Sequence, residues 1–258
     1  MSSINTNVMS LNAQRNLNAS SGALATSMQR LSSGLRVNSA KDDAAGLAIA
    51  ERMNAQVKGM NVAIRNANDG ISMAQTAEGA LGKVGDSLQR MRELAVQSAN
   101  ASNSASDRTN LNAEYQQLND EVTRVLTGTK FNGVDLLNTA ASLSFQVGAN
   151  NVTTDQIAVS TTVLTTGTGV AAVTAGDITS DTNALAAMDD LDDAIDEITT
   201  ARATFGAVQN RFDAVISNLQ VASENQAASR GRIMDADFAT ETSNLSRGQI
   251  LQQAGTAM

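Results

Sequence analysis

The 258-residue chain contains no cysteine, histidine, proline or tryptophan, and aromatic residues make up only 2% of it. Without cysteine and histidine it lacks the commonest metal ligands, the commonest general base and the best thiolate nucleophile. Its apolar side chains are those of alanine, leucine, valine, isoleucine and methionine, which suit thin helical layers better than a thick spherical core. We therefore expect that the protein is not an enzyme and that it binds neither a cofactor nor a metal.

The charge balance excludes further classes. The formal net charge is -8 and the basic residues are scattered, whereas nucleic-acid binding needs clustered lysine and arginine. No run of about 18 apolar residues occurs, so no membrane insertion is expected. Residues 1–5 have neither a basic n-region nor an apolar h-region, so export through a cleaved signal peptide is not expected.

The absence of proline favours long helices, because a proline inside a helix costs about 3 kcal/mol. Between residues 53 and 74 the apolar residues step by four and three positions alternately, which is the heptad pattern of packed helices. The members are Met53, Val57, Met60, Ile64, Ala67, Ile71 and Ala74. The pattern predicts one helix over residues 44–99, with Ser39 or Asp42 as its N-cap.

Helical spacing recurs elsewhere in the chain. A second helix is expected to open at Ser106 or Asp107 and to end near Gly128. A third, over residues 183–230, can pair antiparallel with the first, and a last helix covers the C-terminal apolar residues. Near the N-terminus two shorter apolar stripes occur, and the second of them is broken by Gly34.

The middle of the chain changes period. Asn132-Gly133 is a strong turn signal. Apolar and polar residues alternate over residues 143–147, and residues 152–159 are rich in β-branched side chains, which predicts a β-hairpin. Residues 161–182 could form short strands or a loose loop. The predicted fold class is mainly α: a long antiparallel helical bundle or coiled coil from both chain ends, with a small central β-hairpin region.

The densest charge run lies inside the third predicted helix and consists of Asp189, Asp190, Asp192, Asp193, Asp196 and Glu197. A calcium loop would need a glycine at its sixth position and alternating ligands. The run has helical spacing instead, and carboxylates in the early turns of a helix complement its dipole. It is interpreted as a solvated helix face.

Several long motifs then identify a resemblance. They are Arg-Leu-Ser-Ser-Gly-Leu-Arg at 30–36, Ser-Ala-Lys-Asp-Asp-Ala-Ala-Gly-Leu at 39–47, Leu-Gln-Arg-Met-Arg-Glu-Leu-Ala-Val-Gln-Ser-Ala-Asn at 88–100, Lys-Phe-Asn-Gly at 130–133, Phe-Gln-Val-Gly at 145–148, Gly-Arg-Ile-Met-Asp-Ala-Asp-Phe at 231–238 and Gln-Ile-Leu-Gln-Gln-Ala-Gly at 249–255. In this order they closely resemble the terminal signatures of bacterial flagellins. The resemblance covers about residues 1–160 and 183–258.

The resemblance implies a structural subunit that self-assembles into the bacterial flagellar filament and serves motility. Residues 1–40 and 236–258 would form the inner tube of the filament. Residues 41–160 and 183–235 would form the outer-tube helical domain with its hairpin, and residues 161–182 would be a short variable region. An alternative within the same superfamily is the hook–filament junction protein, which caps the hook and forms no long filament.

The resemblance also implies a location and partners. The subunit would be exported unfolded by the flagellar type III apparatus with its export chaperone and would end up in the extracellular filament. Its partners there would be further copies of itself, the filament cap and the hook-associated proteins. Family members continue beyond a segment like residues 254–258, so we expect a C-terminus that is truncated relative to the family.

The apolar stripes near both chain ends have too little partner surface within one chain, so we expect them to be polymerisation surfaces. The residues are Ile4, Val8, Leu11, Leu24, Met28, Leu31, Leu35, Leu245, Ile250 and Leu251. Some flagellins carry O-linked sugars in the variable region, and the candidate positions here are Ser160, Thr161, Thr162, Thr165 and Thr166.

Four further residues match family positions recognised by the vertebrate Toll-like receptor for flagellin, and they also serve subunit packing: Gln89, Arg90, Leu94 and Glu114. Arg90 and Leu94 are four positions apart, so one helix face can present a guanidinium beside an apolar side chain. From spacing alone, an ordinary helix face with a solvated arginine and a core leucine is the simpler interpretation.

Overall fold

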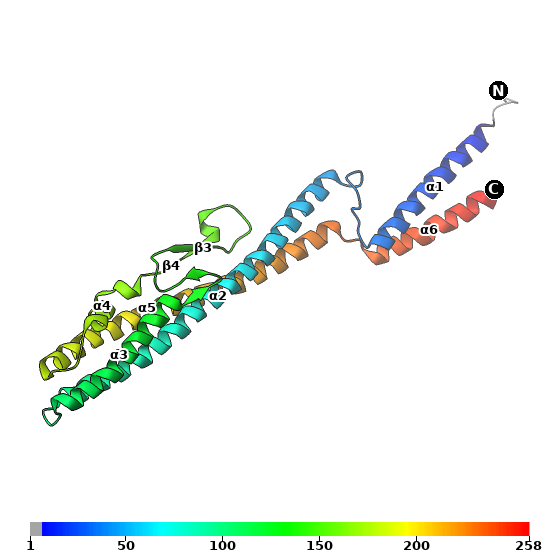
Figure 1. Cartoon of the computed structure of the whole chain (residues 1–258). Coiled ribbons are helices and arrows are strands. Elements are labelled where there is room, and N and C mark those ends of the chain that lie inside the picture. The colour runs from blue at the N-terminus through cyan, green and yellow to red at the C-terminus, as the bar shows by residue number, and fades with distance from the viewer. Residues whose placement is uncertain (1–6, 258) are drawn as a thin grey trace. The chain divides into compact units, whose positions relative to one another are not determined.

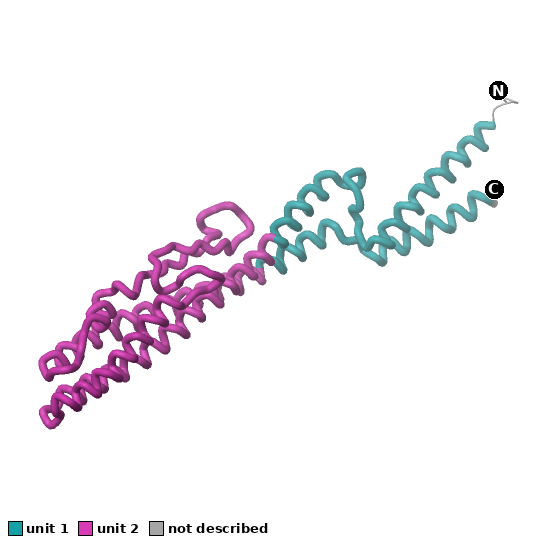
Figure 2. Tube along the Cα trace, viewed as in Figure 1, with its two compact units in different colours: residues 1–58, 222–258 teal, residues 59–221 magenta. Residues whose placement is uncertain are grey.

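The computed structural model describes residues 7–257, and helices dominate it (Figure 1). The helices are α1 (Val8–Ser33), α2 (Ala44–Ser98), α3 (Ala105–Gly128), α4 (Thr168–Ala175), α5 (Asp181–Met234) and α6 (Phe238–Ala257). The strands are β1 (Lys130–Phe131), β2 (Val134–Asp135), β3 (Ser142–Gln146) and β4 (Gln156–Ser160), and two short 3₁₀ turns are η1 (Thr153–Asp155) and η2 (Leu164–Thr166). The chain divides into two compact units, residues 1–58 with 222–258 and residues 59–221 (Figure 2).

The predicted fold class is confirmed. Within the unit of residues 59–221, α2 and α5 are antiparallel, because their contacts run in opposite directions along the two sequences. Ion pairs join Glu78 to Arg202 and Arg92 to Asp192, so the partner number on α5 falls as the number on α2 rises. The observed bounds of α2 and α5 agree with the predicted helices to within a few residues at each end.

The N-caps predicted for α2, Ser39 or Asp42, were wrong, and α3 begins at Ala105, one or two residues before its predicted start. The carboxylate of Asp43 caps α2, because its Oδ1 accepts a hydrogen bond of 2.8 Å from the Gly46 backbone N–H. Asp42 instead closes the preceding turn by accepting the Ser39 N–H at 2.9 Å. For α3 the cap is Ser104, which exchanges hydrogen bonds with Asp107 in a capping box. The end of α3 at Gly128 is as predicted.

The two N-terminal stripes belong to one helix. Helix α1 ends where Gly34 adopts a left-handed backbone conformation with φ +71°, which costs glycine little. Leu35 therefore lies outside the helix, in an isolated bridge with Asp235. Ile4 lies outside the described residues.

The predicted hairpin is confirmed as β3 paired antiparallel with β4, with Phe145 opposite Ile157. Asn132 and Gly133 form the turn between β1 and β2, with φ angles of +48° and +82°. Such a turn needs two residues with positive φ, for which Asn-Gly is the favoured pair. The hairpin is attached to α5 through Phe145, whose ring meets that of Phe212 edge-on at a centroid distance of 5.5 Å.

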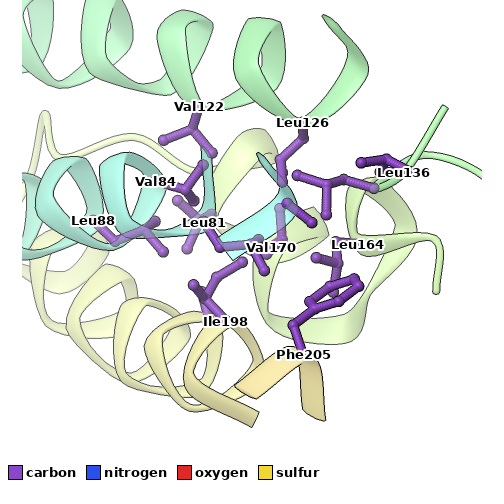
Figure 3. Packing of buried hydrophobic residues seen from close by; sticks show 14 of the residues in the cluster. Leu81, Val84, Leu88, Val122, Leu126, Leu136, Leu164, Val170, Ile198 and Phe205 are labelled. Atoms are coloured by element: carbon purple, nitrogen blue, oxygen red, sulfur yellow. The ribbon is translucent and has the colours of Figure 1, made fainter. Parts of the chain in front are cut away.

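The segment at residues 161–182 is neither strands nor a loose loop. It contains η2 and α4, and its apolar side chains complete the core of the residue 59–221 unit. Figure 3 shows Leu164 and Val170 directed into the same interior as Leu81 and Ile198. We call residues 164–178 the strap, since the segment closes over this core.

Polar side chains hold the strap in place. Asn119 Nδ2 donates to the Thr174 carbonyl at 3.1 Å, Gln116 Nε2 donates to the Gly176 carbonyl at 3.1 Å, and the Ile178 N–H donates to Asn112 Oδ1 at 3.0 Å. Residues 112, 116 and 119 are four and three positions apart on α3, so they share the one face of that helix that binds the strap backbone. The amides satisfy backbone groups that α4 leaves unpaired at its end.

Candidate assembly and recognition surfaces

The first candidate surface is the pair formed by α1 and α6, which lie side by side (Figure 1). The pair is antiparallel: Arg30 contacts Glu241, Leu24 faces Gly248, and Leu17 faces Gly255. The glycines allow this approach, because a Cβ on Gly248 would lie 3.3 Å from Leu24 Cδ1.

The interface between α1 and α6 is polar where it is best buried. Among the described residues of the two helices, the only buried side chains are Ser27 and Glu241. Arg30 Nη1 donates to Glu241 Oε1 at 2.9 Å, and this hydrogen bond is the main cause that holds the pKa of Glu241 below its ordinary value. Up to residue 256, no apolar side chain is fully buried between the two helices, so this part of the pair lacks a hydrophobic core of its own.

The predicted polymerisation residues lie on the outside of this pair or half-buried at its edge. Val8, Leu11, Met28, Ile250 and Leu251 are exposed, with Ile250 at 65%. Leu24, Leu31, Leu35 and Leu245 are half-buried. Fully burying a side chain of this size releases about 1.5–3 kcal/mol, so covering the exposed set offers a large driving force for association.

Several hollows lie along the same pair. One of about 500 Å³ is lined in part by Ser27, Arg30, Glu241 and Leu251. A second of about 400 Å³ has a mixed lining that includes Met9, Leu17 and Leu251 as well as Asn12 and Asn16. Both have room for side chains from outside the pair.

The motif around Gly34 ties the two chain ends together next to the pair. The Arg36 N–H donates to the Met234 carbonyl at 2.6 Å, and the Arg36 guanidinium reaches the Ile233 carbonyl at 2.8 Å. Val37, Ala50 and Met234 form a small buried cluster beside these bonds. The glycine and arginine of this motif thus serve a helix end and the contact between the two chain ends.

The second candidate surface lies on α2 and α3 in the other unit. Arg90 Nε and Nη2 both donate to Glu114 Oε1, at 3.0 and 2.9 Å, and Arg90 Nη1 donates to Glu93 Oε2 at 2.9 Å. All three side chains are about half exposed or more. The hydrogen bond to Glu93, followed by that to Glu114, raises the pKa of Arg90, and the hydrogen bonds to Glu114 join its guanidinium to α3.

Leu94 does not stand exposed beside Arg90, in agreement with the simpler interpretation of a core leucine. Leu94 is only 1% exposed and belongs to the main core. It can act on this surface only by fixing the helix backbone beneath it. The exposed apolar residue nearby is Val96, which lines a shallow hollow of about 440 Å³ together with Gln89, Arg92 and Glu93.

The acidic run on α5 is largely a solvated helix face with two specific contacts. Asp192 accepts two hydrogen bonds from Arg92, at 2.5 and 3.0 Å, and the guanidinium lowers the pKa of its carboxyl. Glu197 is directed at the first turn of α4, where the Val170 N–H lies 3.5 Å from its Oε2. Gly167 permits that approach, because a Cβ there would overlap the Glu197 carboxylate, and Gly169 lets α4 lie against α5, because a Cβ on it would lie 2.5 Å from the Ala194 backbone nitrogen.

The candidate glycosylation positions differ in access. Ser160, Thr162 and Thr166 are exposed, and Thr165 is half-buried with its hydroxyl donating to Asn138 Oδ1 at 2.6 Å. Thr161 is 4% exposed and its hydroxyl donates to the Thr139 carbonyl at 2.6 Å. Thr161 is therefore withdrawn as a candidate, because a sugar there would have to break the end of the hairpin.

No helix in the described part of the chain is both long and apolar enough to cross a bilayer. Within residues 7–257, no group of three or more acidic side chains is arranged to hold a metal ion.

Comparison with known proteins connects these surfaces to a family. The sequence model of the bacterial flagellin N-terminal helical region matches residues 4–142, and that of the bacterial flagellin C-terminal helical region matches residues 188–258. The flagellin of Halalkalibacterium halodurans is 46% identical over 259 residues, covering 99% of this chain and 93% of the relative. The flagellin of Xenorhabdus nematophila is 44% identical over 295 residues, covering 99% and 94%.

Solved structures agree. The crystal structure of Bacillus cereus flagellin is similar with a TM-score of 0.54 at 32% identity, covering 64% of this chain and 94% of that one. A putative flagellar hook-associated protein from Vibrio parahaemolyticus gives a TM-score of 0.63 at 15% identity, covering 75% and 100%. At that identity the second likeness concerns the fold alone.

Proposed function

Because this chain belongs to the bacterial flagellin family, we propose that it is a filament subunit whose α1 and α6 helices are completed by neighbouring copies. One observation carries the proposal: the only buried side chains among the described residues of these helices are polar, while leucine, isoleucine, valine and methionine stand outside. A helix is stable in water mainly through packing of its apolar face. A pair that leaves such side chains exposed gains that packing through association.

The proposal includes the route and the place of assembly. The subunit would pass unfolded through the flagellar type III apparatus with its export chaperone and would assemble outside the cell beneath the filament cap. The low internal burial of α1 and α6 supports an unfolded route, since little packing must be broken before passage. The likeness to flagellins over 99% of the chain supports a filament subunit over a hook–filament junction protein.

Seeded assembly tests the structural role. Purified subunit added to short filament fragments should elongate them, as seen by electron microscopy. Leu251→Asp should prevent elongation, because Leu251 is 53% exposed on α6 and would place a carboxylate where a neighbour packs. The matched control is Leu185→Asp on α5, at 55% exposure, which should still elongate. Equal loss in both variants, with unchanged circular dichroism, would contradict the assignment to the terminal helices.

A second role concerns recognition by the vertebrate Toll-like receptor for flagellin. We propose that Gln89, Arg90 and Glu114 touch the receptor and that Leu94 acts from the core by holding α2 in shape. The support is the fixed, exposed ion pair of Arg90 with Glu114 beside Gln89, since a preorganised charged pair loses little freedom on binding.

A reporter-cell assay with soluble subunit tests the receptor role. Arg90→Ala should abolish signalling, whereas Arg124→Ala should leave it unchanged. Arg124 serves as the matched control, because it too is an exposed arginine that forms an ion pair, with Glu121 three positions away on α3. Unchanged signalling by Arg90→Ala would remove the receptor from the proposal and would leave the structural role untouched.

A further inference from the structure

The ten methionines of the chain are very unequally exposed. In the described part of the chain only two stand open to solvent, Met9 at 81% and Met28 at 56%. Met53, Met60 and Met188 are half-buried. Met73, Met91 and Met234 are 2%, 0% and 6% exposed. The two open thioethers both lie on α1, and neither α2 nor α5 exposes one to this degree.

Both methionines lie on the surface that neighbouring copies are proposed to cover. Met9 borders the hollow of about 400 Å³ whose lining includes Leu17, Leu251 and Gly255. Met28 follows Leu24 by four positions and precedes Leu31 by three, so the three share one stripe of α1. The two methionines are 19 positions apart, which places them about 28 Å apart along the helix and about 100° apart around it.

Thioethers are readily oxidised, so the exposure of Met9 and Met28 makes them targets for oxidants. The chain has no cysteine, so no thiol competes for an oxidant. Exposed methionine is converted by peroxides or hypohalous acids into the sulfoxide, which is polar and chiral and disrupts methionine-rich interfaces. In the reaction with hydrogen peroxide, a sulfur lone pair attacks one peroxide oxygen, the O–O bond breaks, and the second oxygen takes the proton of the first and leaves as water. Sulfur loses two electrons and gains one S–O bond.

We propose that Met9 and Met28 are oxidation sites whose sulfoxides block assembly, so that the free subunit is sensitive to oxidants and the assembled one is protected. The inference rests on the proposed function, because it requires that neighbouring copies cover α1. A buried sulfoxide oxygen without a hydrogen-bond partner carries the penalty of any unpaired polar group. The thioether that it replaces is apolar and adapts easily to an irregular contact.

The inference makes two measurable statements about the intact chain. Peptide mass spectrometry after graded hydrogen peroxide should find Met9 and Met28 oxidised first in the free subunit. Met73 and Met91 serve as internal controls and should stay unmodified, because their sulfur atoms are buried in the core. After assembly, the same treatment should leave Met9 and Met28 largely unmodified.

Seeded elongation then measures the effect on assembly. Oxidised subunit should show a critical concentration raised about tenfold or more, since each 1.4 kcal/mol of lost contact changes it tenfold. A methionine sulfoxide reductase should restore elongation. The double variant Met9→Leu with Met28→Leu keeps the volume and apolar character of both side chains. Whatever its critical concentration before treatment, peroxide should leave that value unchanged in this variant, although its other methionines remain.

The outcomes separate the two claims. If the untreated subunit does not elongate seeds, the proposed function fails. If untreated subunit elongates and oxidised subunit does so at the same critical concentration, the oxidation inference is overturned. It is equally overturned if oxidation inhibits the double leucine variant as strongly as the wild type, since the sensitive methionine would then lie elsewhere.

Discussion

Gly70 in α2 shows how a single absent methyl group determines the packing between two long helices. A Cβ built on Gly70 would lie 2.6 Å from Cζ and 2.8 Å from Cε2 of Phe212 on α5. The Phe212 ring cannot swing aside, because it is 0% exposed and meets the ring of Phe145 edge-on. Gly70→Ala should therefore overpack the core at a cost of about 1–3 kcal/mol.

A second glycine in the same helix separates this cost from helix propensity. Gly79 has no atom within 4 Å of a built Cβ, so Gly79→Ala gains only the backbone advantage of alanine, about 1 kcal/mol. Gly70→Ala receives the same gain, which offsets part of the clash. The two variants should thus differ in free energy of unfolding by about 1–3 kcal/mol, with Gly79→Ala the more stable.

The sequence supplies its own probe for the measurement. Tyr115 is the single tyrosine, no tryptophan is present, and the ring is buried in the unit that contains Gly70. Its fluorescence during urea unfolding therefore follows that unit. A difference below about 0.5 kcal/mol between the two alanine variants would refute the reasoning, because the aromatic rings would then accommodate the methyl group. Phe212→Leu added to Gly70→Ala should recover part of the loss, as expected for two residues in direct contact.

Three further predictions follow from the buried and paired groups. Leu94→Ala should lower the free energy of unfolding in urea by about 2.7–5 kcal/mol, because it leaves a cavity in the core. Arg90→Ala should hardly change the urea midpoint, because the ion pairs of Arg90 are exposed to solvent. The hydrogen bond from Arg30 lowers the pKa of Glu241. The ionised Glu241 should therefore stabilise the α1–α6 pair fully above its ordinary pKa of 4.5, and this stabilisation should be lost as the pH falls through the lowered pKa. Protection of the α1 amides from hydrogen exchange should be greater at pH 6 than at pH 3, and equal protection would contradict the reasoning. Burial is the largest cause that raises the pKa of Tyr115 to about 12, so tyrosinate absorbance at 295 nm should be absent at pH 10.5 and appear when urea is added. Tyr115→Phe should leave the free energy of unfolding unchanged or raise it, because the phenol oxygen has no hydrogen-bond partner among the described residues.

Local patterns predicted the long helices well but not their first residues. The +4/+3 spacing from Met53 to Ala74 predicts α2 because every turn of a packed helix must present an apolar side chain to its neighbour. The caps were misassigned because serine and aspartate occur at several positions before each helix, and each can close a turn. Which carboxylate points at a free N–H depends on the backbone path, as with Asp42 and Asp43.

The secondary structure of the strap could not be predicted from the sequence. Residues 161–182 consist of small and β-branched residues with almost no charge, a composition that fits a loop as well as a strand. Their helical turn is stabilised from outside, by amides on α3 and by a core that needs Leu164 and Val170. Thr161 was proposed as a modification site for the same reason, since its burial follows from its place at the end of the hairpin and not from its neighbours in sequence.

The sequence by itself determined the mainly helical class, the antiparallel long helices, the Asn-Gly turn, the hairpin and the membership suggested by the terminal motifs. These features depend on interactions between residues that are close in the chain, or on periodicity that any solvent-exposed fold must obey. Only the tertiary structure decided that Thr161 is buried, that Glu241 is buried against Arg30, and which methionines are exposed. The burial of a residue depends on which distant parts of the chain pack over it. Helical spacing shows which residues share a helix face, but it does not show which segment covers that face.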